Sequence, residues 1–267
     1  MSEAVVFLFF QCLALGGIVG VLAGLLGIGG GLIVVPALHL LLPDAGIEPQ
    51  LVMPMALATS LASIVMTSAA SARNHYKRGN VSFSVVRSLV PGVLIGGLCG
   101  STLADLLPTA WLPRIFGGIV LILALQMLVS LRVQSHRPLP SPLGQAAAGG
   151  FIGMIASLAG IGGGALTVPY LSYHGVPMRQ AIGCSSLSGA VLSVSAMTGF
   201  IILGLHSEQV LPKWSIGYVY LPALTGIILT SVVATKLGVH LAIKLPTHWV
   251  KKIFALFLMI VSIEMLF

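Results

Sequence analysis

A short glycine-rich motif occurs twice in this chain, and each copy interrupts a long apolar stretch. The first copy reads GIGGG over Gly27–Gly31 and the second reads GIGGG over Gly160–Gly164, and in both a proline follows the last glycine by five residues. Glycine is a poor helix former and proline disrupts a helix, so each copy predicts a break in an apolar helix. Broken membrane helices at corresponding positions of two halves indicate where a transporter binds its substrate.

The composition places the chain in a membrane. Hydrophobic residues make up 57% of it and charged residues only 7%, against about 25% charged in an average soluble domain. The apolar stretches have the length that crosses a bilayer, and no strand-like alternation is sustained, which predicts an all-α polytopic membrane helical bundle. The net charge of +7 does not indicate nucleic-acid binding, because the basic residues fall in short segments between apolar stretches, as the positive-inside rule expects.

Ten apolar stretches divide the chain, five in each half. They span 4–26, 30–42, 51–72, 82–104, 111–131, 143–159, 163–174, 179–204, 214–236 and 249–267. The second stretch of each half follows the glycine motif directly and is too short to cross a bilayer alone. Each half is therefore predicted to open with a glycine-broken helix or hairpin and to continue with three full transmembrane helices.

Further sequence matches between the two halves occur in the same order. Leu107, Pro108, Thr109, Trp111, Ile115 and Phe116 match Leu245, Pro246, Thr247, Trp249, Ile253 and Phe254 at identical spacing. We therefore expect a first transmembrane repeat at 1–131, a polar, proline-rich cytoplasmic linker at 132–142, and a second transmembrane repeat at 143–267.

The basic clusters predict that the repeats are inverted. One cluster follows the third helix of the first half, and its members are Arg73, Lys77 and Arg78. In the second half the cluster follows the fourth helix instead, and it comprises Lys236, Lys244, Lys251 and Lys252. The positive side has moved by one helix between the halves, as an upside-down second repeat requires, and both termini are then extracytoplasmic.

Each break would leave backbone N–H groups unpaired at the start of a short helix, where they and the helix dipole favour an anion. Hydroxyl groups on the third helix of each half could donate further hydrogen bonds without burying a charge. The candidate substrate-binding residues are Gly29, Gly30, Gly31, Thr59, Ser60, Gly162, Gly163, Gly164, Ser185 and Ser186. Two structural interpretations compete with substrate binding. Glycines also allow close helix packing, and buried hydroxyls also bond the preceding turn of their own helix. Packing suits best the evenly spaced glycines Gly16, Gly20, Gly24, Gly92, Gly96 and Gly100.

Several kinds of chemistry have no candidate residues. The sequence contains no Walker A motif, no HExxH and no nucleophile elbow. Its three cysteines are far apart and lie in apolar stretches, which does not fit a metal or redox site. We therefore expect no enzyme activity, no cofactor and no metal. No carboxylate sits clearly at mid-membrane either, so the ion that would drive transport is left open.

The motifs in this order resemble the TauE/SafE sulfite exporter (TSUP) family over nearly the whole chain. The resemblance is carried by GIGGG and proline at Gly27–Pro36 and Gly160–Pro169, and by Tyr76, Gly79, Asn80, Val81, Pro91, Gly92, Gly96, Gly100 and the segment Cys184–Leu187. It implies a multi-pass permease of a bacterial-type plasma membrane. Members move sulfur-containing anions such as sulfite, sulfoacetate or other organosulfonates, usually outward. One departure is local: the second half lacks the basic Tyr–Gly–Asn–Val segment.

The leading hypothesis is a secondary transporter that exports small sulfur-containing anions by alternating access around a site between the two GIGGG breaks. One alternative keeps transport and changes the cargo, to another small anion or to imported reduced sulfur. Another alternative is a non-transporting membrane protein for assembly or interaction. The expected partners are a small anionic substrate and the lipid bilayer, with no nucleic acid, and the sequence is compatible with a homo-oligomer.

Overall fold

The computed structural model describes residues 3–26, 30–129, 138–244 and 247–267. Almost all of this chain is helical. In chain order the elements are α1 Glu3–Leu26, α2 Gly31–Leu41, the short 3₁₀-helix η1 Pro43–Ala45, α3 Pro49–Lys77, α4 Phe83–Leu106, α5 Trp111–Val129, α6 Pro142–Leu158, α7 Gly164–Tyr173, α8 Met178–Leu205, the strands β1 Ser215–Ile216 and β2 Val219–Tyr220, α9 Leu221–Lys244 and α10 Thr247–Leu266.

The helix lengths separate membrane spans from half-length helices. Among the described residues, six helices are long and apolar enough to cross a bilayer, namely α1, α3, α4, α5, α8 and α9. By contrast α2 has 11 residues and α7 has 10, which gives each a length of about 15 Å, half the thickness of a hydrocarbon core. The predicted all-α polytopic membrane bundle, with a short helix after each glycine motif, is confirmed.

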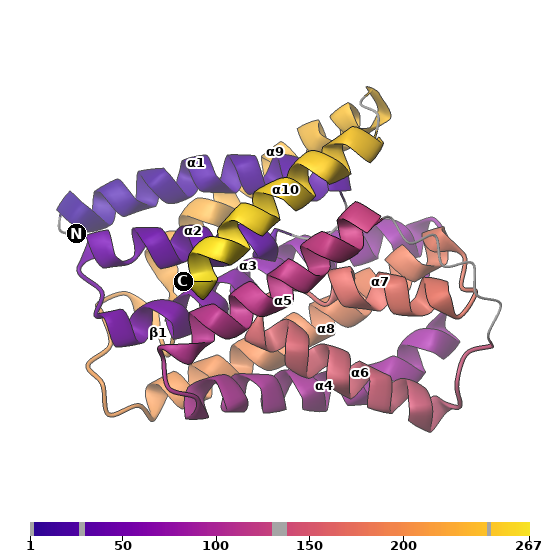
Figure 1. Ribbon diagram of the computed structural model, residues 1–267, viewed down its shortest axis with the longest axis horizontal. Helices are drawn as coiled ribbons and strands as arrows, with labels where there is room; N and C mark the ends of the chain where they lie inside the picture. Colours follow the sequence, from indigo (N-terminus) through magenta and orange to yellow (C-terminus); the bar gives the residue numbers. More distant parts are fainter. Residues whose placement is uncertain (1–2, 27–29, 130–137, 245–246) are drawn as a thin grey trace.

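Two helical hairpins enter the bundle from opposite ends. Both chain termini lie at one end, which we call the terminal end, and α1 runs from there into the bundle before α2 returns toward it (Figure 1). The hairpin of α6 and α7 enters the bundle from the opposite end (Figure 1). That opposite end, where α3 ends and α8 begins, is called the basic end below. Both half-length helices thus begin in the interior and end toward opposite ends.

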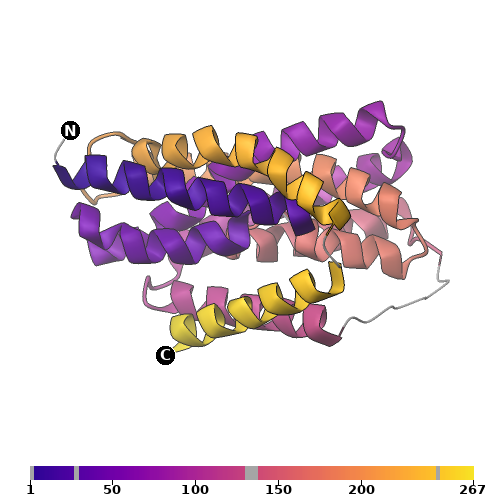
Figure 2. The ribbon, with the colours of Figure 1, turned by 90° about the horizontal axis from the view of Figure 1, so that it is seen from above.

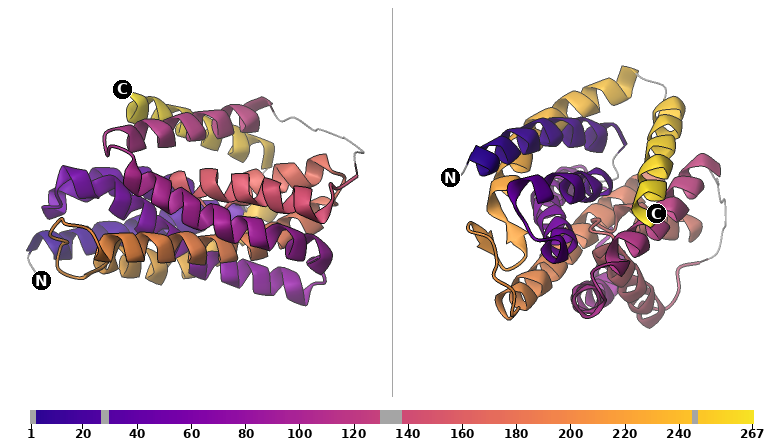
Figure 3. Two further views of the ribbon diagram at one scale, coloured as in Figure 1. Left: turned by 90° about the horizontal axis from the view of Figure 1, so that it is seen from below. Right: turned by 60° about the vertical axis from the view of Figure 1, so that its left-hand side comes forward.

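The two halves of the chain interlock. The first helix of each half packs along the fourth helix of the other: α1 lies on α9, and α6 lies on α4. The third helices α3 and α8 form a central pair, and the fifth helices α5 and α10 form an outer pair on one side of the bundle (Figures 2 and 3). Neither half therefore contains the partner of its own first helix.

Corresponding helices run in opposite directions, as predicted for inverted repeats. Near the end of α3, the Ser71 hydroxyl lies 2.9 Å from that of Ser186, which is near the beginning of α8. Likewise Ser262, near the end of α10, donates a hydrogen bond of 2.5 Å to the carbonyl of Gly117, near the beginning of α5.

Evenly spaced glycines bring the interlocked helices into backbone contact. A β-carbon on Gly92 or Gly96 of α4 would collide with backbone atoms of α6, and one on Gly16 or Gly20 of α1 would collide with α9. Hence these glycines serve close helix packing, the structural role proposed for them from their spacing.

Three element boundaries differ clearly from the sequence prediction, and one of them is the end of α9 at Lys244, eight residues past the predicted 236. The ninth helix begins at Leu221 and not near 214, because residues 215–220 form a two-stranded hairpin in which Ser215 pairs with Tyr220. The third helix continues to Lys77, five residues past the predicted end, since a helix need not stop where its apolar sequence stops. The predicted linker at 132–142 lies mostly outside the described residues.

Candidate functional site

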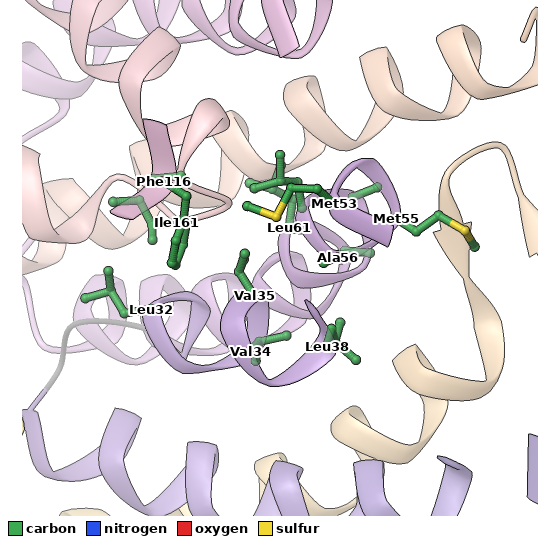
Figure 4. Packing of buried hydrophobic residues seen from close by; sticks show 14 of the residues in the cluster. Leu32, Val34, Val35, Leu38, Met53, Met55, Ala56, Leu61, Phe116 and Ile161 are labelled. Atoms are coloured by element: carbon green, nitrogen blue, oxygen red, sulfur yellow. The ribbon is translucent and has the colours of Figure 1, made fainter. Parts of the chain in front are cut away.

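The two glycine motifs meet inside the bundle. A β-carbon placed on Gly31 would lie 2.5 Å from the carbonyl oxygen of Gly160 and 3.1 Å from the Cα of Ile161. The first distance is too short for a real β-carbon and the second is tight, so the two breaks touch backbone to backbone. Ile161 anchors this contact, because its side chain is 2% exposed and joins the hydrophobic cluster that includes Val35 of α2 (Figure 4).

The first turn of α7 carries unused hydrogen-bond donors. The residue before the helix, Gly163, adopts the left-handed conformation with φ of 69°, which strongly favours glycine. Within the described part of the chain, no backbone N–H of Gly162, Gly163 or Gly164 donates a hydrogen bond. These groups lie at the positive end of the helix dipole and could bind an anion.

Ser193 of α8 faces the same turn. Its hydroxyl is completely buried and has no hydrogen-bond partner among the described residues. A β-carbon on Gly162 would lie 3.8 Å from the Ser193 Oγ and 3.4 Å from the Ser68 Oγ of α3, so both hydroxyls border the Gly162 backbone. A buried unpaired hydroxyl costs about 1–3 kcal/mol, which is a reason to expect a ligand there. We call Gly162, Gly163, Gly164, Ser68 and Ser193 the α7 donor site.

The predicted hydroxyls on α3 are already paired. Thr59 accepts a hydrogen bond of 3.0 Å from the backbone N–H of Tyr220, and Ser60 donates one of 2.8 Å to the carbonyl of Gly160. Both residues are fully buried. Thr59 thus holds the β2–α9 junction, and Ser60 fixes the tip of the α6–α7 hairpin.

Of the equivalent residues on α8, Ser186 bonds within the protein, and the Ser185 hydroxyl has no hydrogen-bond partner among the described residues. Ser186 donates to the carbonyl of Ile182 at 2.9 Å and contacts Ser71, whereas Ser185 is 3% exposed and its carbonyl accepts a hydrogen bond from Ser188. The hydrogen bond from Ser186 to the preceding turn of its own helix matches the structural alternative to substrate binding given above for such hydroxyls.

The remaining predicted glycines divide between the two motifs. Gly162, Gly163 and Gly164 belong to the α7 donor site. Gly30 is buried, and a β-carbon there would collide with Val19 of α1, so it is a packing contact between α1 and the start of α2. Gly29 lies outside the described residues.

Sequence reasoning considered the hydroxyl groups of this helix and did not select Ser193. The signal that could have found it is its register, because Ser193 stands eight residues after Ser185 and therefore about two helical turns further along α8. That position brings it level with the second glycine motif. Ser68 carries no such signal, since it is one hydroxyl in a run of small residues.

Charge is strongly polarised along the bundle axis. All six carboxylates lie where elements begin or end at the terminal end, namely Glu3, Asp44, Glu48, Asp105, Glu208 and Glu264 (Figure 1). Lysines and arginines with described side chains gather in elements near the basic end: Arg73, Lys77, Arg78, Arg87, Arg179, Lys236 and Lys252. Arg114 and Lys213 are the exceptions.

A separate cavity of about 630 Å³ opens between α2, α5 and α10. Its lining is largely apolar but includes His39, Arg114 and Glu264, which come from three different helices. The imidazole Nδ1 of His39 is buried and has no hydrogen-bond partner in the described structure. This cavity is a second place where a polar ligand could lie.

A half-length helix starting inside a bundle of membrane spans is characteristic of a membrane transporter. The sequence profile of the family described as sulfite exporter TauE/SafE matches residues 12–265. The chain therefore belongs to the TauE/SafE family and is a membrane transporter, not an enzyme.

Curated relatives carry the same general description. A "Probable membrane transporter protein" of Haemophilus influenzae is 42% identical over 95% of this chain and 96% of the relative. The "Probable membrane transporter protein MJ0441" of Methanocaldococcus jannaschii is 27% identical over 87% and 86%, and YdhB of Bacillus subtilis is 24% identical over 75% and 82%. No solved structure matches the chain.

Proposed function

We propose that the protein is a secondary transporter that exports small sulfur-containing anions and binds them at the α7 donor site. The observation that carries this proposal is the fully buried hydroxyl of Ser193 beside three backbone N–H groups, none of which has a hydrogen-bond partner in the described part of the chain. Together these groups supply hydrogen-bond donors at the positive end of a helix, which is an arrangement suited to an oxyanion. The description of the TauE/SafE family suggests sulfite as the cargo, and the resemblance of the motifs extends this class to organosulfonates.

The hairpin tips suggest how access could alternate. The α1–α2 hairpin enters from the terminal end and the α6–α7 hairpin from the basic end, and they touch through backbone at Gly31 and Gly160. A shift of the α6–α7 tip breaks the hydrogen bond from Ser60 to the Gly160 carbonyl and moves Ile161 out of its apolar contacts. In this mechanism, movement of one hairpin opens the α7 donor site to one side of the membrane, and movement of the other opens it to the opposite side.

The charge distribution supports outward transport of the anion. Because cytoplasmic segments are enriched in lysine and arginine, the basic end is assigned to the cytoplasm and both termini to the outside of a bacterial-type plasma membrane. An anion that leaves the cytoplasm is then driven by an inside-negative potential, by about 2.3 kcal/mol per charge at 100 mV. That amount suffices for export without a coupled ion.

Flux into and out of proteoliposomes tests the proposal. The panel contains sulfite, sulfoacetate, taurine, thiosulfate and sulfate, and the variants are Ser193→Ala and, as the matched control, Thr198→Ala, an exposed hydroxyl on the same helix. We expect flux of at least one anion, reduced at least about tenfold by Ser193→Ala and unchanged by Thr198→Ala.

Two outcomes would redirect the proposal. If Arg114→Gln abolishes flux while Ser193→Ala does not, the binding site is the cavity between α2, α5 and α10. If no anion moves faster than in empty liposomes, and Gly163→Ala disrupts a protein complex instead, the chain is an assembly protein.

A further inference from the structure

The cavity between α2, α5 and α10 is polar at one end and apolar along the rest of its length. Its charged or titratable side chains are His39, near the end of α2, Arg114, in the first turn of α5, and Glu264, in the last turn of α10. All three of these helix ends belong to the terminal end of the bundle (Figure 1). The polar groups therefore lie at one level, near the surface of the membrane.

Apolar side chains line the cavity below this level. Ile33 precedes His39 by six residues along α2. Phe257 precedes Glu264 by seven residues along α10, so the apolar lining extends about 9–10 Å further into the membrane. Phe257 is 42% exposed and Ile260 is 60% exposed, which places this part of the cavity at the outer surface of the bundle. A polar end at the membrane surface and an apolar length open to the acyl chains suit an amphiphile better than a free ion.

Arg114 and Glu264 offer the polar head of such an amphiphile one charge of each sign. They line the same cavity, yet no ion pair joins them in the described structure. The Arg114 guanidinium lies instead 5.8 Å from the centre of the Trp111 ring. The buried Nδ1 of His39 adds a hydrogen-bonding group that also lacks a partner among the described residues. The head that fits these groups carries both an anion and a cation.

We propose that this cavity binds phosphatidylethanolamine, a phospholipid with a phosphodiester and a primary ammonium in its head. The phosphodiester accepts hydrogen bonds from Arg114, the ammonium donates to Glu264, and an acyl chain lies along the apolar part. The volume of about 630 Å³ falls in the range of about 300–1,000 Å³ that is typical of small-molecule sites. This lipid site is separate from the α7 donor site and goes beyond the proposed function.

The same chemistry disfavours two other common phospholipids. Phosphatidylglycerol has the phosphodiester but no cation, so it leaves Glu264 without a partner and beside a like charge. Phosphatidylcholine has a cation, but its quaternary ammonium carries no N–H to donate to the carboxylate. Both lipids keep the interaction with Arg114 and lose the interaction with Glu264.

A lipid at this position joins parts of the bundle that otherwise meet weakly. Helices α5 and α10 pack mainly on each other, as an outer pair, and α2 makes few contacts with α10 (Figures 2 and 3). An amphiphile that touches all three helices binds the folded protein and not the unfolded chain. Its binding therefore raises the temperature of unfolding.

Thermal unfolding of the full chain in detergent tests the lipid site, with each of the three phospholipids added in turn. We expect phosphatidylethanolamine to raise the unfolding temperature by about 2–4 °C, and the other two lipids by at most about half of that. Native mass spectrometry should show one phosphatidylethanolamine retained on the protein after most other lipid has been removed.

Variants separate the two charges of the site. Arg114→Gln should abolish the shift with phosphatidylethanolamine, whereas Arg114→Lys, which keeps the cation, should retain it. Glu264→Gln should raise the shift with phosphatidylglycerol to that with phosphatidylethanolamine. The matched controls are Arg87→Gln and Glu208→Gln, which remove exposed charges outside the cavity and should change nothing.

Equal shifts with the three lipids in the unchanged protein would overturn the lipid site. A preference for phosphatidylethanolamine that survives both Arg114→Gln and Glu264→Gln would do the same. Stabilisation by sulfite that Arg114→Gln abolishes would show that the cavity takes the transported anion, and would also overturn it. None of the lipid results bears on flux through the α7 donor site, which Ser193→Ala tests separately.

Discussion

Gly31 occupies the point where the two halves of the molecule touch, and it does so as a glycine because no side chain fits. A β-carbon there would lie 2.5 Å from the Gly160 carbonyl and 2.8 Å from Ile64. Gly17 of α1 is the natural comparison, since a β-carbon on it would meet nothing within 4 Å.

Gly31→Ala should separate the hairpin tips. We expect a loss of about 1–3 kcal/mol of unfolding free energy from overpacking and a strong loss of flux. Gly17→Ala should be neutral or stabilising by up to about 1 kcal/mol, because alanine is the better helix former. Thermal unfolding in detergent and proteoliposome flux would measure both effects. Equal behaviour of the two variants would contradict the contact.

Ser193→Ala separates a structural role from a binding role. Since the hydroxyl has no partner in the described structure, its removal should leave ligand-free stability unchanged or raise it by about 1 kcal/mol. A loss of more than about 1 kcal/mol in the absence of anion, measured by thermal unfolding, would indicate a structural hydrogen bond and weigh against the donor site.

At this scale the sequence predicted the positions of the two helix breaks, and it did not predict the contacts of the hydroxyls. Three successive glycines have few structural uses, so the motif could be singled out from its composition alone. A serine, in contrast, has many possible partners. Only the fold decides that Ser60 bonds Gly160 and that Ser193 finds no partner among the described residues. That choice depends on contacts between residues about a hundred positions apart, which no local pattern records.

Among the elements, the paired helices α4 and α6 depend on glycine for their distance. A β-carbon on Gly96 would collide with Gly150, whereas Gly118 of α5 has open space at its position. Gly96→Ala should therefore destabilise the protein by about 1–3 kcal/mol, and Gly118→Ala should not. The fraction that stays monodisperse in detergent after a temperature ramp would show the difference, and indistinguishable variants would refute backbone contact between these helices.

The β1–β2 hairpin contributes a hydrogen bond outside the membrane spans. The Tyr218 phenol donates to the Asp105 carboxylate at the end of α4 over 3.0 Å. Burial of the ring, opposed by a hydrogen bond with Ser207 and reinforced by Asp105, raises the pKa of Tyr218 above its ordinary value of 10.0.

Because the folded state holds the phenolic proton more tightly, this contribution to stability is complete below about pH 10 and disappears as the pH rises through the higher, folded pKa. Tyr218→Phe should cost about 1 kcal/mol at neutral pH and weaken the alkaline loss. Thermal unfolding at neutral and strongly alkaline pH would test this. An identical pH profile in the variant would exclude Tyr218 as the titrating group.

Element boundaries were predictable wherever apolar sequence and helix end together, as for α7 and α8. The start of α9 was not, because residues 215–220 are apolar enough for a helix but pair as strands with Tyr220 bonded to Thr59. Tertiary contact overrode local composition there.

For the molecule as a whole, the polarised charge predicts its orientation in the membrane. A reporter fused after Phe267 should be active outside the cytoplasm, and one inserted after Gly79, in the basic turn between α3 and α4, should be active inside it. A phosphatase and a fluorescent protein serve as complementary reporters. Cytoplasmic activity at Phe267 would refute the assignment of the terminal end.

The interlocked packing also constrains the order in which the molecule can be assembled during synthesis. The first helix, α1, leaves the ribosome early, but its main partner α9 is translated roughly 200 residues later. At about 5–20 residues per second, α1 waits some 10–40 s with a glycine-lined face uncovered. Over that interval the nascent chain depends on the insertion machinery or on surrounding lipid, and a ribosome that stalls before α9 leaves a fragment with no folded state of its own.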